Sequence, residues 1–522
     1  MDVPGIDRIF QEGAGRARGH RDVGAVGNVE DGQAVAGDIG ERSVAADTSD
    51  RPQVEARMTR GEQQGARVVD TGVDIEDHRY AHEPQPNHLA VFWWGRTYGG
   101  RVIGRMPRAR LAGLLAPLMA AGMVLGSGTA VAAVATAGPG GAAGRSGQPS
   151  LTLGRQMSMS ATSTAGVGQG NGRSGCIADL DRDLNTRERV GQLVWVGLAA
   201  DQAPAGVDSV VTTNRLGGVV LLGGFHSGIT TTAKTTAHVH GLSDTRVRIA
   251  IAADQEGGYV QQVQGSGVST IPTAFVQGRT YGASTTLRNL TTRWGGQLAA
   301  AGIDVNLAPV ADTVAKDFMS QNGPIGRYQR NYDYVSSRVA ADVGVVIAGM
   351  HAGGVATTVK HFPGLGRITG NTDTTGVGIT DTTTTATSGY LDPFAAGIAA
   401  GADLVMISNA WYSKLDATHQ APFSSAIVTG LLRGQLGYRG TVVSDDLGNA
   451  VAVSSVPVAL RATRFIRAGG DIVLTADPST VPTMTRAIML ARASSPRFKK
   501  LMDAAVLRVL TMKTERGLTR CS

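Results

Sequence analysis

The chain has 522 residues, which is enough for two or three domains, and its formal net charge at pH 7 is +7. From residue 138 onward the basic residues form no run and no patch interleaved with aromatic residues, so nucleic-acid binding is not expected. Two cysteines cannot build a closed zinc site, and the histidines lack metal-ligand spacing, so neither a metal nor a cofactor is expected.

Residues 1–105 are rich in Arg, Asp, Glu and Gly and contain few apolar runs. Such a segment cannot bury enough apolar surface to offset the conformational entropy of the chain. We interpret it either as a disordered leader or as the product of a start codon placed too far upstream. No function is assigned to it.

Met106 begins a different kind of segment. The short basic stretch 107–110 is followed by the almost wholly apolar residues 111–125, and then by small residues with Ala-x-Ala sites near 130–135. This order is typical of a secretory signal peptide, which we expect over residues 106–137. A membrane anchor is the alternative, because residues 111–137 are long enough to span a bilayer. We therefore expect the protein to be secreted or held in the cell envelope, outside the cytoplasmic membrane.

Residues 138–175 are rich in Gly, Ser, Thr and Ala and are expected to form a flexible linker. The folded part is expected to begin at Cys176, and the second cysteine, Cys521, nearly ends the chain. Because the termini of a barrel lie close together and exported proteins meet oxidising conditions, we expect a Cys176–Cys521 disulfide, with two unpaired thiols as the alternative. The excess of Lys and Arg over Asp and Glu after residue 138 could also draw an exported protein to anionic cell-wall polymer.

Eight short apolar runs recur through the folded part and alternate with helical patterns. Runs that are apolar almost throughout are typical of strands buried on both faces of a sheet. Several helical patterns end in Gly just before the next run, as helix C-caps do. The expected strands are 193–198, 218–222, 248–252, 303–307, 355–359, 403–407, 441–444 and 471–474. The expected helices include 286–301, 334–353, 393–400, 424–436, 456–468 and 480–491.

Eight strand–helix units over residues 176–522 predict one α/β domain, a single (β/α)8 barrel. A doubly wound sheet is rejected, because it normally carries a Gly-rich phosphate loop after its first strand and none follows here. Reactive side chains of such barrels stand at the C-terminal ends of the strands. Five expected strands are followed there by polar residues, namely Asp254, Asp312, Lys360 with His361, Ser408 with Asn409, and Asp445 with Asp446.

These residues favour carboxylate chemistry. Two carboxylates can act as nucleophile and acid/base on a glycosidic bond, and Lys, His and Arg side chains around them can hold the hydroxyls of one sugar ring. No nucleophile elbow is present, so a serine mechanism is not expected.

Four motifs give the chain a resemblance to a known family. In this order they resemble glycoside hydrolase family 3, specifically its single-domain bacterial β-N-acetylhexosaminidases, over about residues 185–515. No second α/β domain follows the expected barrel, which favours this branch over the family's β-glucosidases. The motifs are Asp254-Gln255-Glu256-Gly257-Gly258, Leu307-Ala308-Pro309-Val310-Ala311-Asp312, Lys360-His361-Phe362-Pro363-Gly364 and Val443-Ser444-Asp445-Asp446-Leu447.

The resemblance implies roles for individual residues. Asp445 aligns with the nucleophile that forms a glycosyl-enzyme intermediate, and Asp446 is expected to be structural or a hydrogen-bond partner. Arg327 and Arg330 both follow an Ile-Gly pair, and Arg330 is preferred because Asn331-Tyr332 comes after it. The side chains expected to bind sugar hydroxyls are Asp254, Arg330, Lys360 and His361.

The chain departs from the family's pattern in two places that matter for chemistry. Thr375 stands where the family has its acid/base His, and Gln262 replaces a second Arg after the first motif. A hydroxyl is too weak an acid near neutral pH, and Asp373 is the only carboxylate in the Gly- and Thr-rich loop 364–378. We therefore predict that Asp373 is the acid/base, with its pKa raised by partial desolvation and by Asp445. The alternative is that Asp373 only caps the loop.

The sequence thus predicts an exo-acting retaining glycoside hydrolase that releases terminal β-linked N-acetylglucosamine from peptidoglycan fragments or related glycans. Its expected partner is a carbohydrate that contains N-acetylglucosamine. A β-glucosidase or a glycoside phosphorylase of the same family is the alternative among enzymes. A carbohydrate-binding pseudoenzyme is the alternative outside them, and the intact Asp445 argues against it.

Overall fold

The structure, a computed structural model, describes residues 167–521. The expected leader, the signal peptide or anchor, and residues 138–166 of the expected linker lie outside the described residues. Within the described part, no helix is long and apolar enough to cross a membrane.

The first helix, α2 (Val167–Asp183), begins inside the range that we expected to be linker. Its Gly- and Ser-containing sequence has poor intrinsic helix propensity, which is why composition alone assigned it to a linker. The helix packs against α12 (Pro496–Glu515) and carries the half-cystine Cys176. Tertiary contacts therefore override local propensity here.

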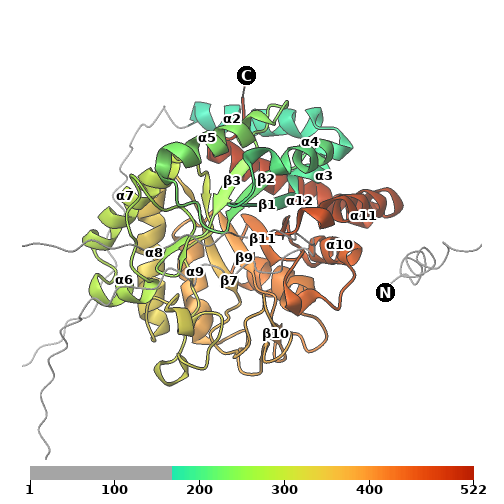
Figure 1. The fold of residues 1–522 in the computed structure, drawn as a ribbon. Helices are drawn as coiled ribbons and strands as arrows, with labels where there is room; N and C mark the ends of the chain where they lie inside the picture. The colour runs from blue at the N-terminus through green and yellow to red at the C-terminus, as the bar shows by residue number, and fades with distance from the viewer. Residues whose placement is uncertain (1–166, 522) are drawn as a thin grey trace, which may run out of the picture. The chain divides into compact units, whose positions relative to one another are not determined.

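Eight parallel strands close into a barrel, which confirms the predicted (β/α)8 fold (Figure 1). Each observed strand overlaps one predicted apolar run, and the residues of all eight are buried or nearly so. Around the barrel the strands are β1 (Val194–Ala199), β12 (Ile472–Thr475), β11 (Thr441–Asp446), β9 (Leu404–Ile407), β7 (Ala356–Phe362), β6 (Val305–Asn306), β3 (Ala250–Ala253) and β2 (Gly218–Leu222).

The helices that cover the barrel follow the amphipathic patterns of the sequence. Helix α7 (Thr285–Ala300) is an example: Ser284 caps it by accepting from the Leu287 N–H, and its face with Trp294 and Leu298 is buried. It ends before Gly302, whose φ of 76° is a conformation that favours glycine. The other α-helices are α3 (Thr186–Gln192), α4 (Asp208–Asn214), α5 (Gly228–Gly241), α6 (Ala274–Thr280), α8 (Ser336–Ala352), α9 (Asp392–Ala399), α10 (Val458–Ala468) and α11 (Val481–Ser494).

One predicted helix has an unexpected form, and two short strand pairs were not expected. The predicted helix 424–436 is a π-helix, η7 (Ala426–Gln435), because its hydrogen bonds close wider turns. A short antiparallel hairpin, β4 (Gln255–Gly257) with β5 (Val260–Gln261), follows β3 at the C-terminal end of the barrel. A parallel pair, β8 (Thr380–Asp381) with β10 (Trp411–Tyr412), links two of the loops at that same end.

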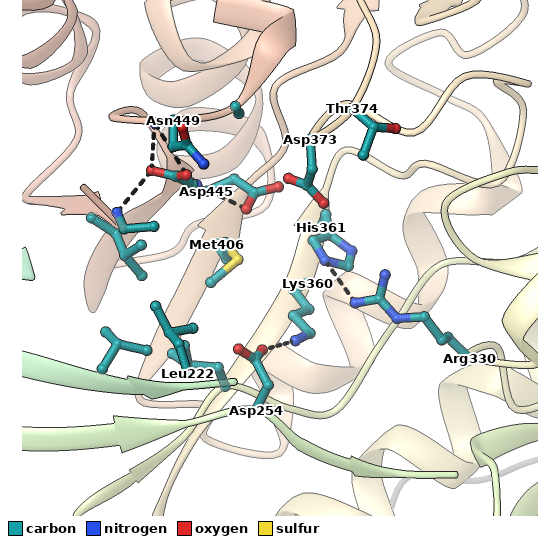
Figure 2. A pocket seen from close by; sticks show the side chains of 16 residues that line it. Leu222, Asp254, Arg330, Lys360, His361, Asp373, Thr374, Met406, Asp445 and Asn449 are labelled. Atoms are coloured by element: carbon teal, nitrogen blue, oxygen red, sulfur yellow. Dashed lines mark hydrogen bonds and ion pairs between the residues drawn. The ribbon is translucent and has the colours of Figure 1, made fainter. Parts of the chain in front are cut away.

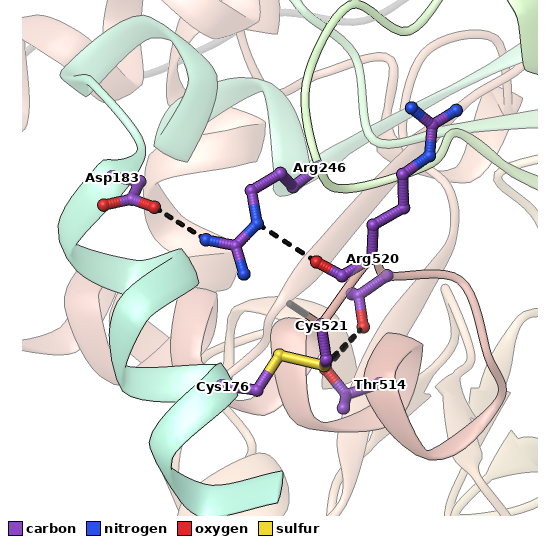
Figure 3. Close-up of a disulfide and its surroundings, with 7 residues drawn as sticks. Cys176, Asp183, Arg246, Thr514, Arg520 and Cys521 are labelled. Carbon is purple, nitrogen blue, oxygen red and sulfur yellow. Dashed lines mark hydrogen bonds and ion pairs between the residues drawn. A yellow bond between two sulfur atoms is a disulfide. The ribbon is translucent and has the colours of Figure 1, made fainter. Parts of the chain in front are cut away.

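The predicted disulfide is confirmed. Cys176 in α2 and Cys521 at the end of the chain are bonded, with their Cα atoms 5.5 Å apart and 345 positions between them in sequence (Figure 3). Arg246 lies beside the bridge, where it donates to the Arg520 carbonyl at 3.0 Å and pairs with Asp183 at 2.9 Å. The two ends of the folded domain are thus fixed to each other covalently and by hydrogen bonds.

The N-terminal ends of the strands are held by a repeated device. Three aspartates stand directly before β6, β9 and β12, and each accepts a backbone N–H from the neighbouring strand. A buried carboxylate in such a place needs these donors and a cation to offset its desolvation. The three bonds, each 2.8 Å long, run from Ile251 to Asp304, from Thr357 to Asp403 and from Val442 to Asp471.

Cations complete this end of the barrel. Asp471, which is fully buried, also accepts from Arg433 at 2.7 Å and from Arg508 at 2.7 and 2.9 Å. The buried ammonium of Lys513 on α12 donates to the Gln192 side chain and to two backbone carbonyls at 2.6–2.8 Å. Arg508 and Lys513 therefore fasten the C-terminal helix to the floor of the barrel, although burial lowers the pKa of Lys513 to about 7.

Candidate active site

A cleft opens at the C-terminal ends of the strands and gathers the polar residues that the sequence placed there (Figure 2). It holds about 630 Å³ of space, its open mouth included, which suits a single sugar ring. Apolar side chains such as Met406 and Leu222 form part of its wall. Asp254 and Lys360 lie toward one end of the cleft, and the carboxylates of Asp373 and Asp445 face each other at the other end.

Four charged side chains form a connected group at the first end. The buried Lys360 ammonium, on β7, pairs with Asp254 at 2.5 Å and with Glu256 at 2.6 Å. Arg330 donates from both Nε and Nη2 to the two Glu256 oxygens, at 2.8 and 2.7 Å. This two-pronged contact fixes the guanidinium plane, so a sugar would meet donors and acceptors that are already in position.

The electrostatics of this group favour the charged forms of Glu256 and Lys360. Burial opposes ionisation of Glu256, but the charges of Arg330 and Lys360 outweigh it and lower the pKa of Glu256 to about 2. Burial also works against the charge of Lys360, and the carboxylates of Asp254 and Glu256 nonetheless raise its pKa. Glu256 therefore serves as a fixed counter-charge, which leaves Asp254 and Lys360 to present polar atoms to the cleft.

His361 is aimed by Asp312. The His361 Nδ1 lies 2.7 Å from Asp312 Oδ2, and Asp312 Oδ1 accepts from the Leu365 backbone N–H at 2.7 Å. The opposite ring nitrogen, Nε2, lies 3.4 Å from Arg330 Nη2. Since a carboxylate at Nδ1 favours a proton on that nitrogen, Nε2 faces the arginine as an acceptor.

Asp445 and Asp446 end β11 but have different surroundings. Asp446 is buried and accepts backbone N–H groups from Gly448, Asn449 and Ala476 at 2.8–3.2 Å. Burial raises the pKa of Asp446 to about 6, although these hydrogen bonds act in the opposite direction. Asp445 accepts from the Asp446 N–H at 2.9 Å and points into the cleft. Asp446 is thus bound up in the turn, and Asp445 is the carboxylate free to meet a ligand.

Asp373 reaches the cleft from the long loop that follows β7. Two backbone bonds, from Val451 to the Asp373 carbonyl at 3.1 Å and from Ala452 to the Thr372 carbonyl at 3.0 Å, fasten this loop to the segment after β11. The side chain of Asn322 holds the start of the loop by donating to the carbonyls of Leu365 and Ile368 at 2.8 Å. The Gly- and Thr-rich loop is therefore held over the site by hydrogen bonds at both of these points.

The environment of Asp373 favours its protonated form. Burial raises its pKa well above the ordinary value, and the nearby carboxylates of Asp445 and Asp446 raise it further. In the described part of the chain, no ion pair involves Asp373 or Asp445. Because Asp373 favours its protonated form and faces the Asp445 carboxylate, it can hold a proton ready to donate beside that second carboxylate.

The structure brings together all six residues that the sequence assigned to catalysis or sugar binding: Asp254, Arg330, Lys360, His361, Asp373 and Asp445. The choice between the two arginines agrees with the geometry, because Arg330 is buried in the site and Arg327 is exposed. Thr375 uses its hydroxyl within its own loop, where it accepts from the Val377 N–H at 2.9 Å. Its side chain is not part of the cleft lining.

Sequence reasoning missed the roles of Glu256 and Asp312. Both stood inside the motifs that we singled out, but nothing in their spacing showed that they contact Arg330 and His361 rather than a ligand. A usable signal did exist, because an acidic residue inside an otherwise buried segment needs a cationic or N–H partner. Within residues 167–521, no group of histidine, cysteine or acidic side chains is arranged to hold a metal ion.

Comparisons with known proteins agree with this geometry. A β-hexosaminidase of Xanthomonas campestris pv. campestris is 30% identical over 301 residues, which span 57% of this chain and 88% of that protein. The crystal structure of a β-N-acetylhexosaminidase from Beutenbergia cavernae is 44% identical with a TM-score of 0.60, and the match covers 64% of this chain and 99% of that one.

A family 3 β-N-acetylglucosaminidase from a Paenibacillus species is 28% identical with a TM-score of 0.56, and the match covers 64% of this chain and 63% of that one. Residues 185–512 match the family described as "Glycosyl hydrolase family 3 N terminal domain", and this range contains every cleft residue discussed above. The barrel, the cleft and this match lead to one conclusion: the chain belongs to glycoside hydrolase family 3 and is a glycosidase.

Proposed function

We propose that the protein is an exo-acting, retaining β-N-acetylglucosaminidase that removes terminal β-linked N-acetylglucosamine from peptidoglycan fragments or related glycans. The observation that carries the proposal is the pair of facing carboxylates, Asp373 and Asp445, set opposite a fixed group of hydroxyl-binding side chains. The names of the similar proteins support the choice of sugar, since they are β-hexosaminidases and β-N-acetylglucosaminidases.

In the first step the Asp445 carboxylate attacks the anomeric carbon and forms an ester to it, while the bond to the leaving oxygen breaks. Asp373 gives its proton to that oxygen, so the aglycone leaves as a neutral alcohol. In the second step Asp373 takes a proton from water, which attacks the anomeric carbon and frees Asp445. Two displacements at one carbon retain its configuration. The raised pKa of Asp373 suits a residue that must be an acid first and a base afterwards.

Contacts to the ring hydroxyls should strengthen as positive charge develops on the sugar. Lys360 and Asp254 present a donor and an acceptor that are already paired, at 2.5 Å, and Arg330 with His361 extends this set. Because these groups are held before the substrate arrives, little reorganisation is needed at the transition state.

One assay tests the sugar and the acceptor together. We expect p-nitrophenol to be released from the β-N-acetylglucosaminide at least about tenfold faster than from the β-glucoside, with no dependence on phosphate. Faster release from the β-glucoside would assign the protein to the β-glucosidases. Acceleration by phosphate, with a sugar 1-phosphate as product, would assign it to the phosphorylases.

We also propose that the enzyme acts outside the cytoplasmic membrane, in the medium or at the cell wall. The basic stretch and apolar run after Met106 support export, and the Cys176–Cys521 bridge suits oxidising surroundings. Expression from Met106 should give exported protein whose N-terminus lies near residues 132–135. A product that stays in the membrane after a carbonate wash would contradict cleavage and support an anchor.

A further inference from the structure

A second pocket adjoins the cleft and is used by none of the steps above. It holds about 580 Å³, its mouth included, and shares Asp254 and Arg330 with the cleft. Its remaining wall includes Tyr259, Gln262 and Gln264; we call this space the Gln262 pocket. Neither Asp373 nor Asp445 lines it, so it lies beyond the hydroxyl-binding end of the cleft and away from the reacting carboxylates.

The walls of the Gln262 pocket are already assembled. The loop after β2 and the segment after β5 are zipped together: Phe225 donates to the Gln262 carbonyl at 2.6 Å, and Gln264 donates back to the Phe225 carbonyl at 2.9 Å. The Gln262 side chain joins them as well, since its Oε1 accepts from the Gly224 N–H at 2.9 Å. A pocket with a fixed backbone frame can bind a ligand without ordering a loop first.

Two neutral amides offer free polar atoms to the pocket, beside the imidazole of His226 and the already paired Asp254 and Arg330. The Gln262 amide nitrogen takes part in no hydrogen bond within the described chain, so it can donate to a ligand. Gln264 donates through Nε2 to the Gln261 carbonyl at 2.7 Å, and its Oε1 stays available as an acceptor. A donor beside an acceptor, with no added charge from either glutamine, fits a group with hydroxyls, which donate and accept equally well.

An aromatic face borders the same space. Tyr259 is 55% exposed, which is unusual for a large side chain, and it meets the ring of Tyr328 edge-on, with centroids 5.9 Å apart. The edge contact fixes Tyr259 and leaves its ring able to stack on a ligand. Amide groups beside an aromatic ring form the combination that a sugar ring, apolar on its faces and polar at its rim, can use.

We propose that the Gln262 pocket binds one further neutral sugar unit, attached to the non-reducing side of the sugar in the cleft. Given the proposed function, on which this inference rests, the anomeric carbon lies at Asp445 and the opposite carbons of the ring lie at Asp254. A substituent on those opposite carbons points toward the pocket. The enzyme then still acts from the non-reducing end, but it can remove a terminal disaccharide in one step as well as a terminal N-acetylglucosamine.

The test uses p-nitrophenyl β-N,N′-diacetylchitobioside beside the p-nitrophenyl monosaccharide, with products followed over time. We expect nitrophenol and intact disaccharide to appear together, from the first turnover. Nitrophenol that appears only after free N-acetylglucosamine, with no intact disaccharide at any time, would overturn the proposal, because the sugar units would then leave only one at a time. Failure of the proposed function is distinguishable, since the monosaccharide itself would then release no nitrophenol.

Two variants locate the effect. Tyr259→Ala removes the exposed ring, and Gln262→Arg fills the pocket with a longer, charged side chain. Each should lower the ratio of disaccharide to monosaccharide kcat/KM at least about tenfold. Leu490→Ala, a truncation of a 47% exposed side chain on α11, is the matched control and should leave that ratio unchanged. An unchanged ratio in both pocket variants, with the monosaccharide still hydrolysed, would place the second sugar elsewhere.

Discussion

Both ends of the barrel contain buried carboxylates, but the two ends differ in the partners that these carboxylates have. At the N-terminal end, Asp304, Asp403 and Asp471 each accept a backbone N–H and each meet a cationic or imidazole partner. At the C-terminal end, Asp373 and Asp445 face each other, and neither forms an ion pair with any of the described residues. The same fold therefore stabilises carboxylates with partners at one end of the barrel and places two carboxylates that repel each other at the other end.

This difference indicates that one end of the barrel stabilises the fold and the other end carries the chemistry. The paired carboxylates at the N-terminal end hold the strands and the C-terminal helix together. In the cleft, burial and the neighbouring carboxylates raise the pKa of Asp373, which destabilises the fold but supplies an acid beside a nucleophile.

Asp445→Asn should lower kcat/KM on the p-nitrophenyl β-N-acetylglucosaminide by on the order of 10⁴-fold or more, because an amide cannot attack the anomeric carbon usefully. Stability should not fall, since no ion pair is broken. A mechanism-based fluoro-sugar should label Asp445 in the wild type, as read by mass spectrometry of peptides. A label on Asp446 or elsewhere would show that the nucleophile is misassigned.

Asp373→Ala should lower the rate on substrates with poor leaving groups by on the order of 10²–10⁴-fold, and affect the first step much less with nitrophenyl glycosides, which need no protonation. Azide, which attacks without base help, should restore part of the rate and give a glycosyl azide. Equal, modest losses on both substrates with no azide product would leave Asp373 a loop residue. The conservative variant Thr375→Ala is the control and should retain activity.

At the N-terminal end of the barrel, Asp471→Asn should lower stability and leave activity unchanged. It leaves Arg433 and Arg508 without their buried partner, so the free energy of unfolding should fall by about 3–5 kcal/mol, with kcat of the folded enzyme unchanged. Asp244→Asn, which removes a mostly exposed partner of Arg215, should cost less than about 1 kcal/mol. The free energies of unfolding are measured with a denaturant. Equal losses in the two variants would show that the buried pairs of Asp471 stabilise the fold no more than an exposed pair does.

Asp373→Asn tests the cost of the opposed pair. Because the pKa of Asp373 is raised in the folded state, the folded protein binds a proton there more tightly than the unfolded chain does. Stability from this group is present below the unfolded pKa and is lost as pH rises through the folded pKa. The Asn variant should therefore unfold a few degrees higher near pH 7 and lose this advantage below about pH 4. A variant less stable at pH 7 would mean that Asp373 supports the fold.

Much of this fold could be predicted, because buried parallel strands leave continuous apolar runs such as 441–444 and helices that end in glycine leave clear boundaries. The cleft residues could be predicted for a related reason: strand ends meet at one edge of a barrel, so Asp254, Lys360 and Asp445 had to be neighbours.

The partners of those residues could not be predicted. Whether Glu256 meets a sugar or Arg330 depends on a two-residue turn after β4 that has no periodic signature. The hydrogen bond from Val451 to Asp373 joins the segment after β11 to the loop after β7. It uses backbone atoms only, so no pattern of side chains in the sequence signals it. The helical start of α2 depended on distant contacts and on the disulfide, and these outweighed its glycines.

The bond between Cys176 and Cys521 gives the domain the topology of a ring. The backbone from one cysteine to the other, 345 positions long, is closed by a single link that is not a peptide bond. Tension applied between the stretch before residue 176 and the extreme C-terminus travels through two sulfur atoms and bypasses the barrel. One proteolytic cut in an exposed loop opens the ring without dividing it, so both fragments stay joined until the bridge is reduced. For an enzyme proposed to work outside the cell, this topology keeps the domain in one covalent piece after a first proteolytic cut.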